Sequence, residues 1–237
     1  MNLIETIRIK SKYECINQKS CLITFLNPYS YLLARKNIDL FKKFDCIYID
    51  GQLLVKMLSL FNISHTNRKS FDMTSLAPKV FEESIKKHQS IFFIGADAES
   101  IENTINLLRE HYPLLKINGY RDGYFLNSMQ REDVLNDIVL QSPDLVICGM
   151  GTPLQENFLY DLKESGWNGI GYTCGGFLHQ TAKRIDYYPN WINKYNLRWA
   201  YRIYDEPKLF KRYFYQYPIA IGVFTFDYIC FKFSRLI

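Results

Sequence analysis

The sequence predicts an α/β fold: a Rossmann-like parallel sheet with helices on both faces, followed by a helical C-terminal appendage rich in basic and aromatic residues. Short apolar runs typical of buried strands alternate with segments whose apolar residues recur at helical spacing, and this alternation indicates a parallel sheet. Basic character begins only after residue 182. We therefore expect a core domain over 1–182 and an appendage over 183–237.

Six short apolar runs bounded by turn residues are the predicted strands. They are 21–26, 46–49, 90–95, 114–117, 145–148 and 169–173, with helices expected around 31–36, 53–61, 76–85, 101–108 and 134–139 and again from 155 onward. Residues 1–20 are polar and give only weak signals. The chain has no repeat, low-complexity run or Gly/Ser linker, which favours one continuous sheet.

Polar and glycine-rich segments fall at the carboxyl ends of these strands. They are 24–27, 50–51, 95–97, 119–125, 149–156 and 175–176. In an open parallel sheet, ligands bind beyond the carboxyl ends of the strands. We expect these segments to rim one crevice that holds the functional site.

The segment Gly149-Met150-Gly151-Thr152-Pro153-Leu154-Gln155-Glu156 joins a glycine turn to the start of a helix. Unpaired amides at a helix N-terminus carry about half a positive charge, so phosphate binds there readily. A strand-to-helix turn without a ligand is the alternative. Leu154 stands where the third glycine of a dinucleotide fingerprint belongs, and no Gly-Lys-Ser/Thr follows as in a Walker loop.

Asp50 is the best candidate for a general base, because it ends a predicted strand just before Gly51. Partial burial there raises a carboxyl pKa toward a useful value. A helix cap is the alternative role for Asp50, and Asp72 and Asp122 fit a cap or a turn better than a catalytic role. The four histidines show no metal-ligand spacing and no Asp-x-Asp pair occurs, so we predict no metal site and no cofactor.

Charge is unevenly distributed along the 237 residues, whose net charge is +5. Residues 183–237 hold ten Lys and Arg against four Asp and Glu, a net charge of +6, together with 17 of the 38 aromatic residues. Residues 1–182 sum to −1. Basic and aromatic residues together suit an anionic lipid surface or a nucleic acid, and the acidic core argues against a nucleic-acid groove across it.

The tail pattern predicts two short amphipathic helices joined near Pro207. Arg198 and Arg202 recur one turn apart, as do Trp191, Tyr195 and Trp199. One interpretation places the aromatic side chains at a lipid interface and the arginines on phosphate. The other is a solvated basic face on helices that pack against the core.

The compartment expected from the sequence is the cytoplasm, with peripheral attachment to the membrane. The six cysteines show no C-x-x-C pairing and are expected to be buried, reduced thiols. No N-terminal signal is visible. The longest apolar stretch, 219–231, has 13 residues and contains Asp227. It is too short to span a bilayer, which requires about 20 residues.

Four motifs occur in a specific order. Asn27-Pro28 and Asp50-Gly51 come first, the box G-x-G-x-P-x-Q-E at 149–156 follows, and the tail carries W-x-Y-R at 199–202 with Glu206-Pro207. In this order and spacing they resemble the WecG/TagA/CpsF family of bacterial glycosyltransferases. The resemblance extends over residues 20–215.

The resemblance implies an inverting, metal-independent glycosyltransferase of bacterial surface polysaccharide synthesis. Such an enzyme moves a sugar of the N-acetylmannosamine, hexose or uronate type from a UDP-sugar to a sugar on polyprenyl (undecaprenyl) diphosphate. Its partners are then the UDP-sugar, the lipid-linked acceptor and the cytoplasmic face of the membrane, with no nucleic acid. Whether the chain forms a homo-oligomer is left open by the sequence.

Residue roles carried over from the family fall on matching positions. Asp50 becomes the catalytic base, with Asn27 and Thr24 beside the acceptor; Thr24 is one position away from the family's threonine. Arg68 is likewise displaced within the pattern that precedes Asp72. The implied substrate-binding residues are Gly51, Arg68, Asp72, Gly119, Tyr124, Phe125, Gly149, Gly151, Pro153, Gln155, Glu156, Arg202 and Arg212.

Two other classes of protein compete with this hypothesis. One is a nucleotide-cofactor oxidoreductase, disfavoured by the missing third glycine. The other is a non-catalytic protein that binds lipid or nucleic acid through the basic tail alone.

Overall fold

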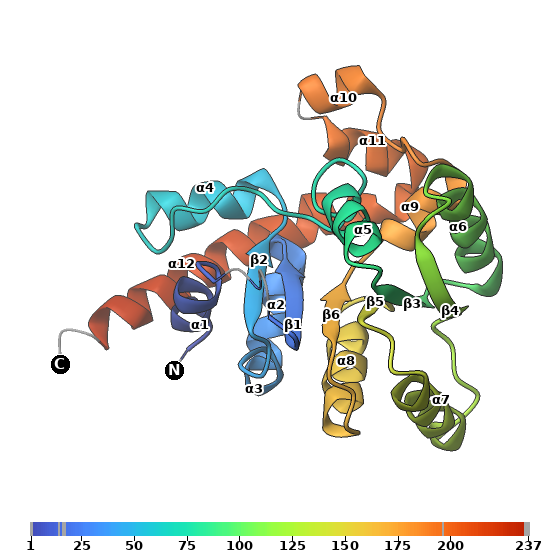
Figure 1. Ribbon diagram of the computed structural model, residues 1–237. Helices are drawn as coiled ribbons and strands as arrows, with labels where there is room; N and C mark the ends of the chain where they lie inside the picture. Colours follow the sequence, from blue (N-terminus) through green and yellow to red (C-terminus); the bar gives the residue numbers. More distant parts are fainter. Residues whose placement is uncertain (1, 14, 16–17, 196, 235–237) are drawn as a thin grey trace.

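The computed structural model describes residues 2–13, 15, 18–195 and 197–234. Within them, six parallel strands form one sheet in the order β2-β1-β6-β5-β3-β4 (Figure 1). The strands are β1 (Cys21–Leu26), β2 (Cys46–Ile49), β3 (Ser90–Gly95), β4 (Lys116–Arg121), β5 (Leu145–Gly149) and β6 (Ile170–Thr173).

Helices connect the strands and cover both faces of the sheet. They are α1 (Leu3–Lys10), α2 (Pro28–Lys36), α3 (Ile38–Phe41), α4 (Gln52–Leu60), α5 (Ala77–Lys86), α6 (Ala98–His111), α7 (Ser128–Gln141), α8 (Leu154–Glu164) and α9 (Phe177–Lys183). The amphipathic helices form because apolar residues recur at helical spacing, and capping side chains fix several starts. Asn27, for example, accepts hydrogen bonds from the Tyr29 and Ser30 amides at the start of α2.

Alternate residues of the central strands face opposite layers of the core. Ile91 and Phe93 of β3 pack with α5, α6 and α9, whereas Phe92 and Ile94 pack with α7 and α8. The period of two residues in a strand produces this division. The predicted fold class, a Rossmann-like parallel sheet with helices on both faces, is confirmed.

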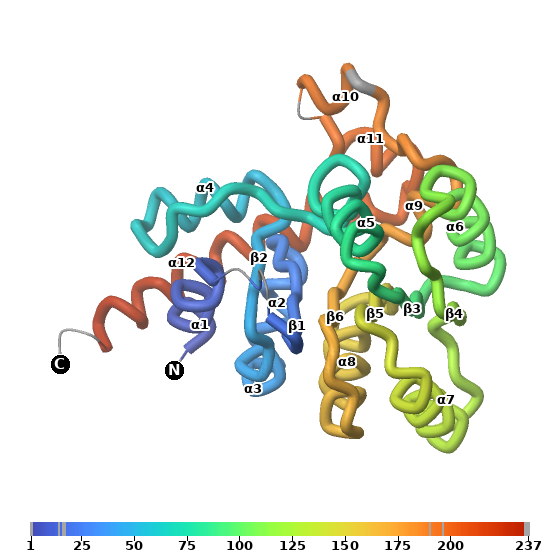
Figure 2. The backbone as a smooth tube through the Cα atoms, in the orientation of Figure 1, coloured from blue at the N-terminus to red at the C-terminus, as the bar shows by residue number. Residues whose placement is uncertain are grey.

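The tail wraps from the carboxyl end of the sheet to the edge formed by β2. It consists of α10 (Asn190–Lys194), α11 (Arg198–Asp205), the 3-10 turn η1 (Pro207–Leu209), the π-helical turn η2 (Arg212–Gln216) and α12 (Tyr217–Phe233). Figure 2 traces α12 running alongside α2 to α1, which it contacts. Phe224 and Phe231 of α12 are buried in the same core cluster as α1, α2 and α4.

The structure of the tail differs from the predicted pair of short helices. The two helices predicted around Pro207 are in fact several shorter elements followed by the 17-residue α12. The proposed domain boundary after residue 182 falls at the last turn of α9. Over the part of the chain that the structure describes, no helix combines the length and apolarity needed to cross a membrane.

The fourth strand lies further along the chain than predicted. It runs over Lys116–Arg121 rather than 114–117, so Gly119 is inside the strand and not at its end. A Cβ on Gly119 would lie 2.6 Å from Cε2 of Phe92. The glycine therefore allows β4 to pack closely on β3, a packing role that turn-based reasoning mistook for a strand end.

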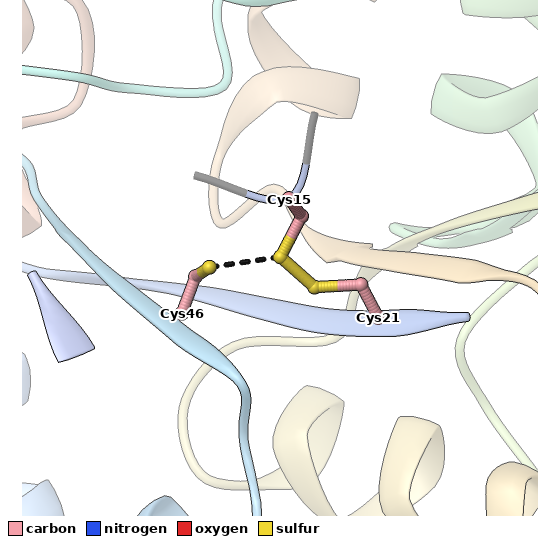
Figure 3. Close-up of side chains that lie close together, drawn as sticks. All are labelled: Cys15, Cys21 and Cys46. Atoms are coloured by element: carbon pink, nitrogen blue, oxygen red, sulfur yellow. Dashed lines mark hydrogen bonds between the residues drawn. A yellow bond between two sulfur atoms is a disulfide. The ribbon is translucent and has the colours of Figure 1, made fainter. Parts of the chain in front are cut away.

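The expectation of six buried, reduced cysteines is wrong for three of them. Cys15 and Cys21 form a disulfide, and the Cys46 sulfur lies 2.8 Å from that of Cys15 (Figure 3). Cys230 is exposed, while Cys148 and Cys174 are free and buried as expected. Local spacing could not reveal the pairing, because it depends on how the segment before β1 folds back onto the sheet.

Candidate active site

A cavity of about 1170 Å³ lies over the carboxyl ends of the strands. Its lining combines the segments that follow β1, β2, β5 and β6 with tail residues from α11 to η2. Of the predicted site residues, those that line it are Asn27, Asp50, Gly51, Arg68, Asp72, Tyr124, Gly149, Gly151, Gln155, Arg202 and Arg212. Chain segments far apart in sequence thus meet at one site.

Asp50 stands at the carboxyl end of the buried strand β2. Its amide donates a 2.7 Å hydrogen bond to the Leu26 carbonyl, which holds the backbone against β1. Helix α4 begins with Gly51 as its N-cap and no side-chain cap. Asp50 therefore does not cap the helix, and its carboxylate, with 36% of the side chain exposed, faces the cavity.

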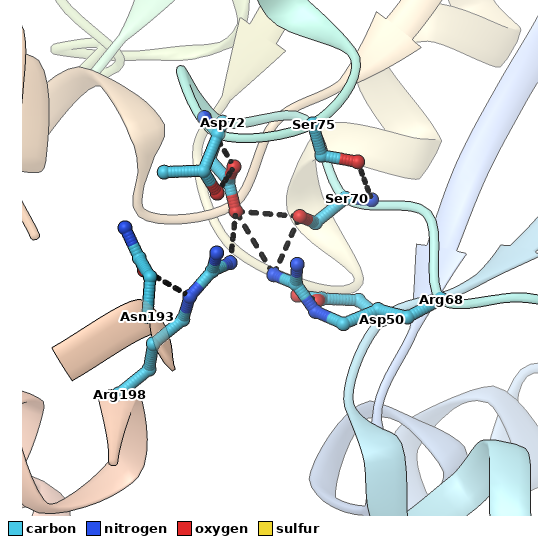
Figure 4. A network of polar contacts seen from close by, with 8 residues as sticks. Asp50, Arg68, Ser70, Asp72, Ser75, Asn193 and Arg198 are labelled. Carbon is cyan, nitrogen blue, oxygen red and sulfur yellow. Dashed lines mark hydrogen bonds and ion pairs between the residues drawn. The ribbon is translucent and has the colours of Figure 1, made fainter. Parts of the chain in front are cut away.

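Arg68 connects Asp50 to Asp72 (Figure 4). Its Nη2 lies 3.2 Å from Oδ1 of Asp50 and 2.9 Å from Oδ2 of Asp72. Nη1 of Arg198, a residue of α11, lies 3.6 Å from Oδ2 of Asp72. Nε of Arg198 donates a hydrogen bond to Oδ1 of Asn193. The cluster therefore ties β2, the loop before α5 and the tail together.

The two carboxylates of this cluster have opposite pKa shifts. Burial raises the pKa of Asp50, and the Asp72 charge adds to this, while Arg68 and Arg202 oppose it. At Asp72 burial also acts to raise the pKa, but Arg68 and the hydroxyls of Ser70 and Thr74 outweigh it and the pKa falls below its ordinary value. Asp72 is thus the permanent anion, and Asp50 is suited to exchange a proton.

Of the two structural roles predicted for Asp72, the turn is confirmed and the cap of the following helix is wrong. Helix α5 starts at Ala77 with Leu76 as its N-cap and no side-chain cap. The Asp72 carboxylate instead accepts from the Thr74 amide at 2.8 Å, inside its own loop. The Asp72 carboxylate pairs with Arg68, four residues earlier, and with the distant Arg198 of α11, and helix-start patterns report neither contact.

The glycine turn after β5 has the form that the sequence predicts. A Cβ on Gly95, whose φ is +138°, would lie 2.4 Å from the Gly149 carbonyl oxygen, so β3 and β5 end in direct backbone contact. Gly151 has a φ of +78°. Pro153, after a cis peptide bond, is the N-cap of α8. The turn and the helix start thus present backbone to the cavity.

Glu156 lies beneath this turn and not in the cavity. It is fully buried and accepts hydrogen bonds from Thr24 at 2.8 Å, Gln155 at 3.1 Å and Thr152 at 3.3 Å. Burial raises its pKa, with these hydrogen bonds opposing the shift. Gln155 also accepts from the Gly175 amide at 3.3 Å, so the network joins β1, α8 and the segment after β6.

Two arginines of the tail, Arg202 and Arg212, line the cavity. Arg202 pairs with Glu206 at 3.3 Å and lies so close to Gly176 that a Cβ there would be 3.1 Å from Nη2. Within the described part of the chain, its Nε is buried and has no hydrogen-bond partner. Arg212 stacks over the Tyr29 ring at 4.5 Å. Arg202 is also close enough to Asp50, at the end of β2, to act against the rise of the Asp50 pKa.

Some predicted residues lie outside the cavity lining. Thr24 and Glu156 are beneath it, Gly119 is in β4, Pro153 is the cap of α8, and Phe125 packs on Phe158. Arg198 and His179 are among the cavity residues that were not predicted as site residues. Arg198 could have been found from its one-turn spacing to Arg202, but nothing in the sequence indicates that His179, held by Ser100 at 3.2 Å, faces the cavity.

The cavity thus brings the Asp50 carboxylate together with guanidinium groups of the tail. A family model described as "Glycosyl transferase WecG/TagA/CpsF family" matches residues 5–230. The chain belongs to this family and is a glycosyltransferase, as the motifs predict.

Curated relatives cover most of the chain. It is 38% identical over 214 residues to the UDP-Gal:alpha-D-GlcNAc-diphosphoundecaprenol beta-1,4-galactosyltransferase of Shigella boydii, covering 90% of each chain. It is 26% identical over 215 residues to the N-acetylglucosaminyldiphosphoundecaprenol N-acetyl-beta-D-mannosaminyltransferase of Bacillus subtilis (strain 168), covering 89% of this chain and 82% of that one. The enzyme of that second name from Staphylococcus aureus (strain NCTC 8325 / PS 47) is 26% identical over 169 residues, 70% of this chain and 63% of the relative.

Proposed function

We propose that this chain transfers galactose from UDP-galactose to N-acetylglucosamine carried on undecaprenyl diphosphate, with inversion at the anomeric carbon. The donor and acceptor follow the name of the Shigella boydii relative, whose match is stronger and more complete than those of the N-acetylmannosamine transferases. The reaction serves synthesis of a bacterial surface polysaccharide. Our proposal for the mechanism is independent of the sugar.

The observation that carries the mechanism is the Asp50 carboxylate, which faces the cavity and has a raised pKa. In its ionised form it accepts the proton of the acceptor hydroxyl as the oxygen attacks the anomeric carbon. The bond from that carbon to the UDP oxygen breaks on the opposite face, which inverts the configuration. A positioned general base contributes about 10²- to 10⁴-fold to such a step.

Negative charge develops on UDP as it departs, and the tail arginines that line the cavity are cationic. We assign the diphosphate to the region between the Gly149–Gly151 turn, the start of α8, and Arg202 and Arg212. Amides at a helix start and guanidinium groups both favour phosphate oxygens. With these groups supplying the positive charge, the step needs no metal ion.

The appendage over 183–237 is our candidate for the membrane contact. Trp191, Tyr195, Phe226 and Phe233 are among its exposed aromatic side chains, and its net charge is +6. Each basic group near an anionic lipid surface contributes about 1 kcal/mol. Contact through this surface brings the cavity to an acceptor that is anchored in the membrane.

The test is UDP release from separate UDP-sugars (galactose, glucose, N-acetylglucosamine, N-acetylmannosamine and glucuronate), each with and without GlcNAc-diphosphoundecaprenol. We expect acceptor-dependent release with UDP-galactose and no effect of EDTA on the rate. Release with UDP-N-acetylmannosamine alone would refute the donor assignment while leaving the reaction class intact. Absence of UDP binding would refute the proposal as a whole.

A further inference from the structure

Three cysteine side chains meet at the end of the sheet opposite the cavity. Cys21 and Cys46 are the first residues of β1 and β2, and Cys15 reaches them from the segment after α1 (Figure 3). The three sulfur atoms lie within 4.8 Å of one another. Among the residues that the structure describes, a search for three or more His, Cys, Asp or Glu side chains close enough to share a metal ion finds these three cysteines.

The sheet itself aligns two of these thiols. Strands β1 and β2 pair in parallel with Ile23 opposite Cys46, and side chains two residues apart in a strand share a face. Cys21, Ile23 and Cys46 therefore point to the same side of the sheet, where they pack with Cys15 and Tyr48. The hydrogen-bonded strands hold the positions of Cys21 and Cys46 without help from a bridge.

The surroundings suit a soft cation better than a hard one. Cys21 and Cys46 are 0% and 1% exposed and Cys15 is 8% exposed, so water reaches the group only on the Cys15 side. Thiolates select thiophilic ions such as Zn²⁺ over Mg²⁺ or Ca²⁺.

We propose that Cys15, Cys21 and Cys46 form a three-thiolate site for one thiophilic d¹⁰ cation, Zn²⁺, once the Cys15–Cys21 disulfide is reduced. Three sulfurs on one zinc ion, each at about 2.3 Å, lie about 3.8 Å apart. This separation falls within the span that the sulfurs already occupy. The fourth position is on the exposed side of Cys15 and takes water.

Reduction of the disulfide comes before binding of the ion. A phosphine reductant gives two electrons to the disulfide and becomes a phosphine oxide by taking oxygen from water, whose two protons complete the two thiols. Zn²⁺ then displaces the protons of the three thiols and binds the thiolates. Reoxidation to the disulfide removes two of the three ligands, so the oxidised chain does not hold the ion.

The site is structural and not catalytic. Cys46 precedes the cavity residue Asp50 by four residues along β2, and Cys21 precedes Asn27 by six along β1. At roughly 3.3 Å per residue the two cysteines lie about 13 and 20 Å along their strands from those residues. The ion would fasten the segment between α1 and β1 to the sheet. Metal binding and metal-independent transfer are therefore separate properties of one chain, and the site does not depend on the function proposed above.

The experiment is a Co²⁺ titration of the full chain, reduced with a phosphine and stripped of metal under nitrogen. We expect intense thiolate-to-cobalt absorption that saturates at one ion per chain and is abolished by stoichiometric Zn²⁺. Cys46→Ser and Cys21→Ser should weaken binding by more than the roughly 10- to 100-fold that loss of an outer-shell partner costs. Cys230→Ser, which removes an exposed cysteine away from the cluster, is the matched control and should bind as the wild type does.

Cys46→Ala replaces Cys46→Ser as the test variant if the serine variant fails to fold. Circular dichroism checks that each variant is folded. Absence of the thiolate-to-cobalt band in the reduced wild type would overturn the proposal. So would equal binding by the reduced wild type and the Cys21 and Cys46 variants, because the ion would then be bound by other cysteines. Equal Co²⁺ binding by the oxidised and reduced chains would overturn it as well.

Discussion

Arg68 holds the Asp50 and Asp72 carboxylates at once, at 3.2 Å and 2.9 Å from a single guanidinium nitrogen. The partly buried Asp50 carboxyl has a raised pKa even with this cation beside it. The protonation of the candidate base is therefore set by the balance between burial, the cations Arg68 and Arg202, and the Asp72 anion. Two substitutions shift that balance in opposite directions.

Arg68→Met removes a cation that lowers the pKa of Asp50, so this pKa should rise further. Because the base acts when ionised, kcat/KM rises with pH through the Asp50 pKa, and its acidic limb should move to higher pH in the variant. A pH profile of kcat/KM measures the shift. An unchanged limb would mean that another group controls the profile.

Asp72→Asn should move the same limb to lower pH. It removes an anion that raises the pKa of Asp50, and it leaves Arg68 free to pair with Asp50 alone. The profile of this variant is compared with those of the wild type and Arg68→Met. Shifts of the two variants in the same direction would contradict the charge balance and indicate a general loss of site structure.

Gly95→Ala should destabilise the chain by about 2 kcal/mol or more. Its φ of +138° disfavours any side chain, and the new Cβ would meet the Gly149 carbonyl at 2.4 Å. Gly222→Ala is the matched control, because Gly222 lies in α12 with no atom near the new Cβ and alanine favours helix by up to about 1 kcal/mol. Urea unfolding measures both, and equal effects would contradict the close contact of β3 and β5.

Glu156→Gln should change how stability depends on pH. The folded-state pKa of Glu156 is raised by burial, so the neutral acid stabilises the fold below its ordinary value of 4.5 and that stability is lost as pH rises through the folded pKa. Glutamine cannot ionise. The free energy of unfolding of the wild type should therefore fall relative to that of the variant as pH rises above 4.5. Parallel curves in urea titrations would show that Glu156 does not ionise over this range.

Asp227→Asn should loosen α12 from α2. The carboxylate accepts from the Tyr31 hydroxyl and from Nε of Arg35, each at 2.8 Å, and Tyr31 is fully buried. Because Arg35 is 46% exposed, we expect a loss of only about 1 to 2 kcal/mol. Hydrogen exchange in α12 measures it. Asp39→Asn, which breaks the exposed pair with Lys42, is the control and should leave α12 unchanged.

Patterns of short range were sufficient to predict most of the fold and much of the site. The strand 90–95 and the glycine turn at Gly149 were found because apolar runs and turn glycines are local signals. Asp50 at a strand end followed from the general rule for parallel sheets. The closeness of Arg202 to Gly176 could be expected only from the family resemblance, because 26 residues separate them in the chain.

The features that the sequence did not predict depend on packing between residues far apart in the chain. The displacement of β4 follows from the contact of Gly119 with Phe92, and the cluster of Cys15, Cys21 and Cys46 follows from the return of the N-terminal segment. Helix α1 forms in a stretch with weak signals because Ile4 and Ile7 are buried in the core cluster that includes α12. The contacts of Gly119 and of the cysteines leave no periodic pattern in the sequence, and Leu3, Ile4 and Ile7 of α1 give only one short helical repeat.

The proposed mechanism depends on one step, in which Asp50 accepts the proton of the acceptor hydroxyl. Its most direct test is the turnover number of Asp50→Asn with UDP-galactose and GlcNAc-diphosphoundecaprenol, measured beside UDP affinity by calorimetry. We predict a loss of about 10²- to 10⁴-fold in kcat with UDP affinity unchanged. Turnover near that of the wild type would contradict the mechanism, and a joint loss of turnover and UDP binding would assign Asp50 a structural role.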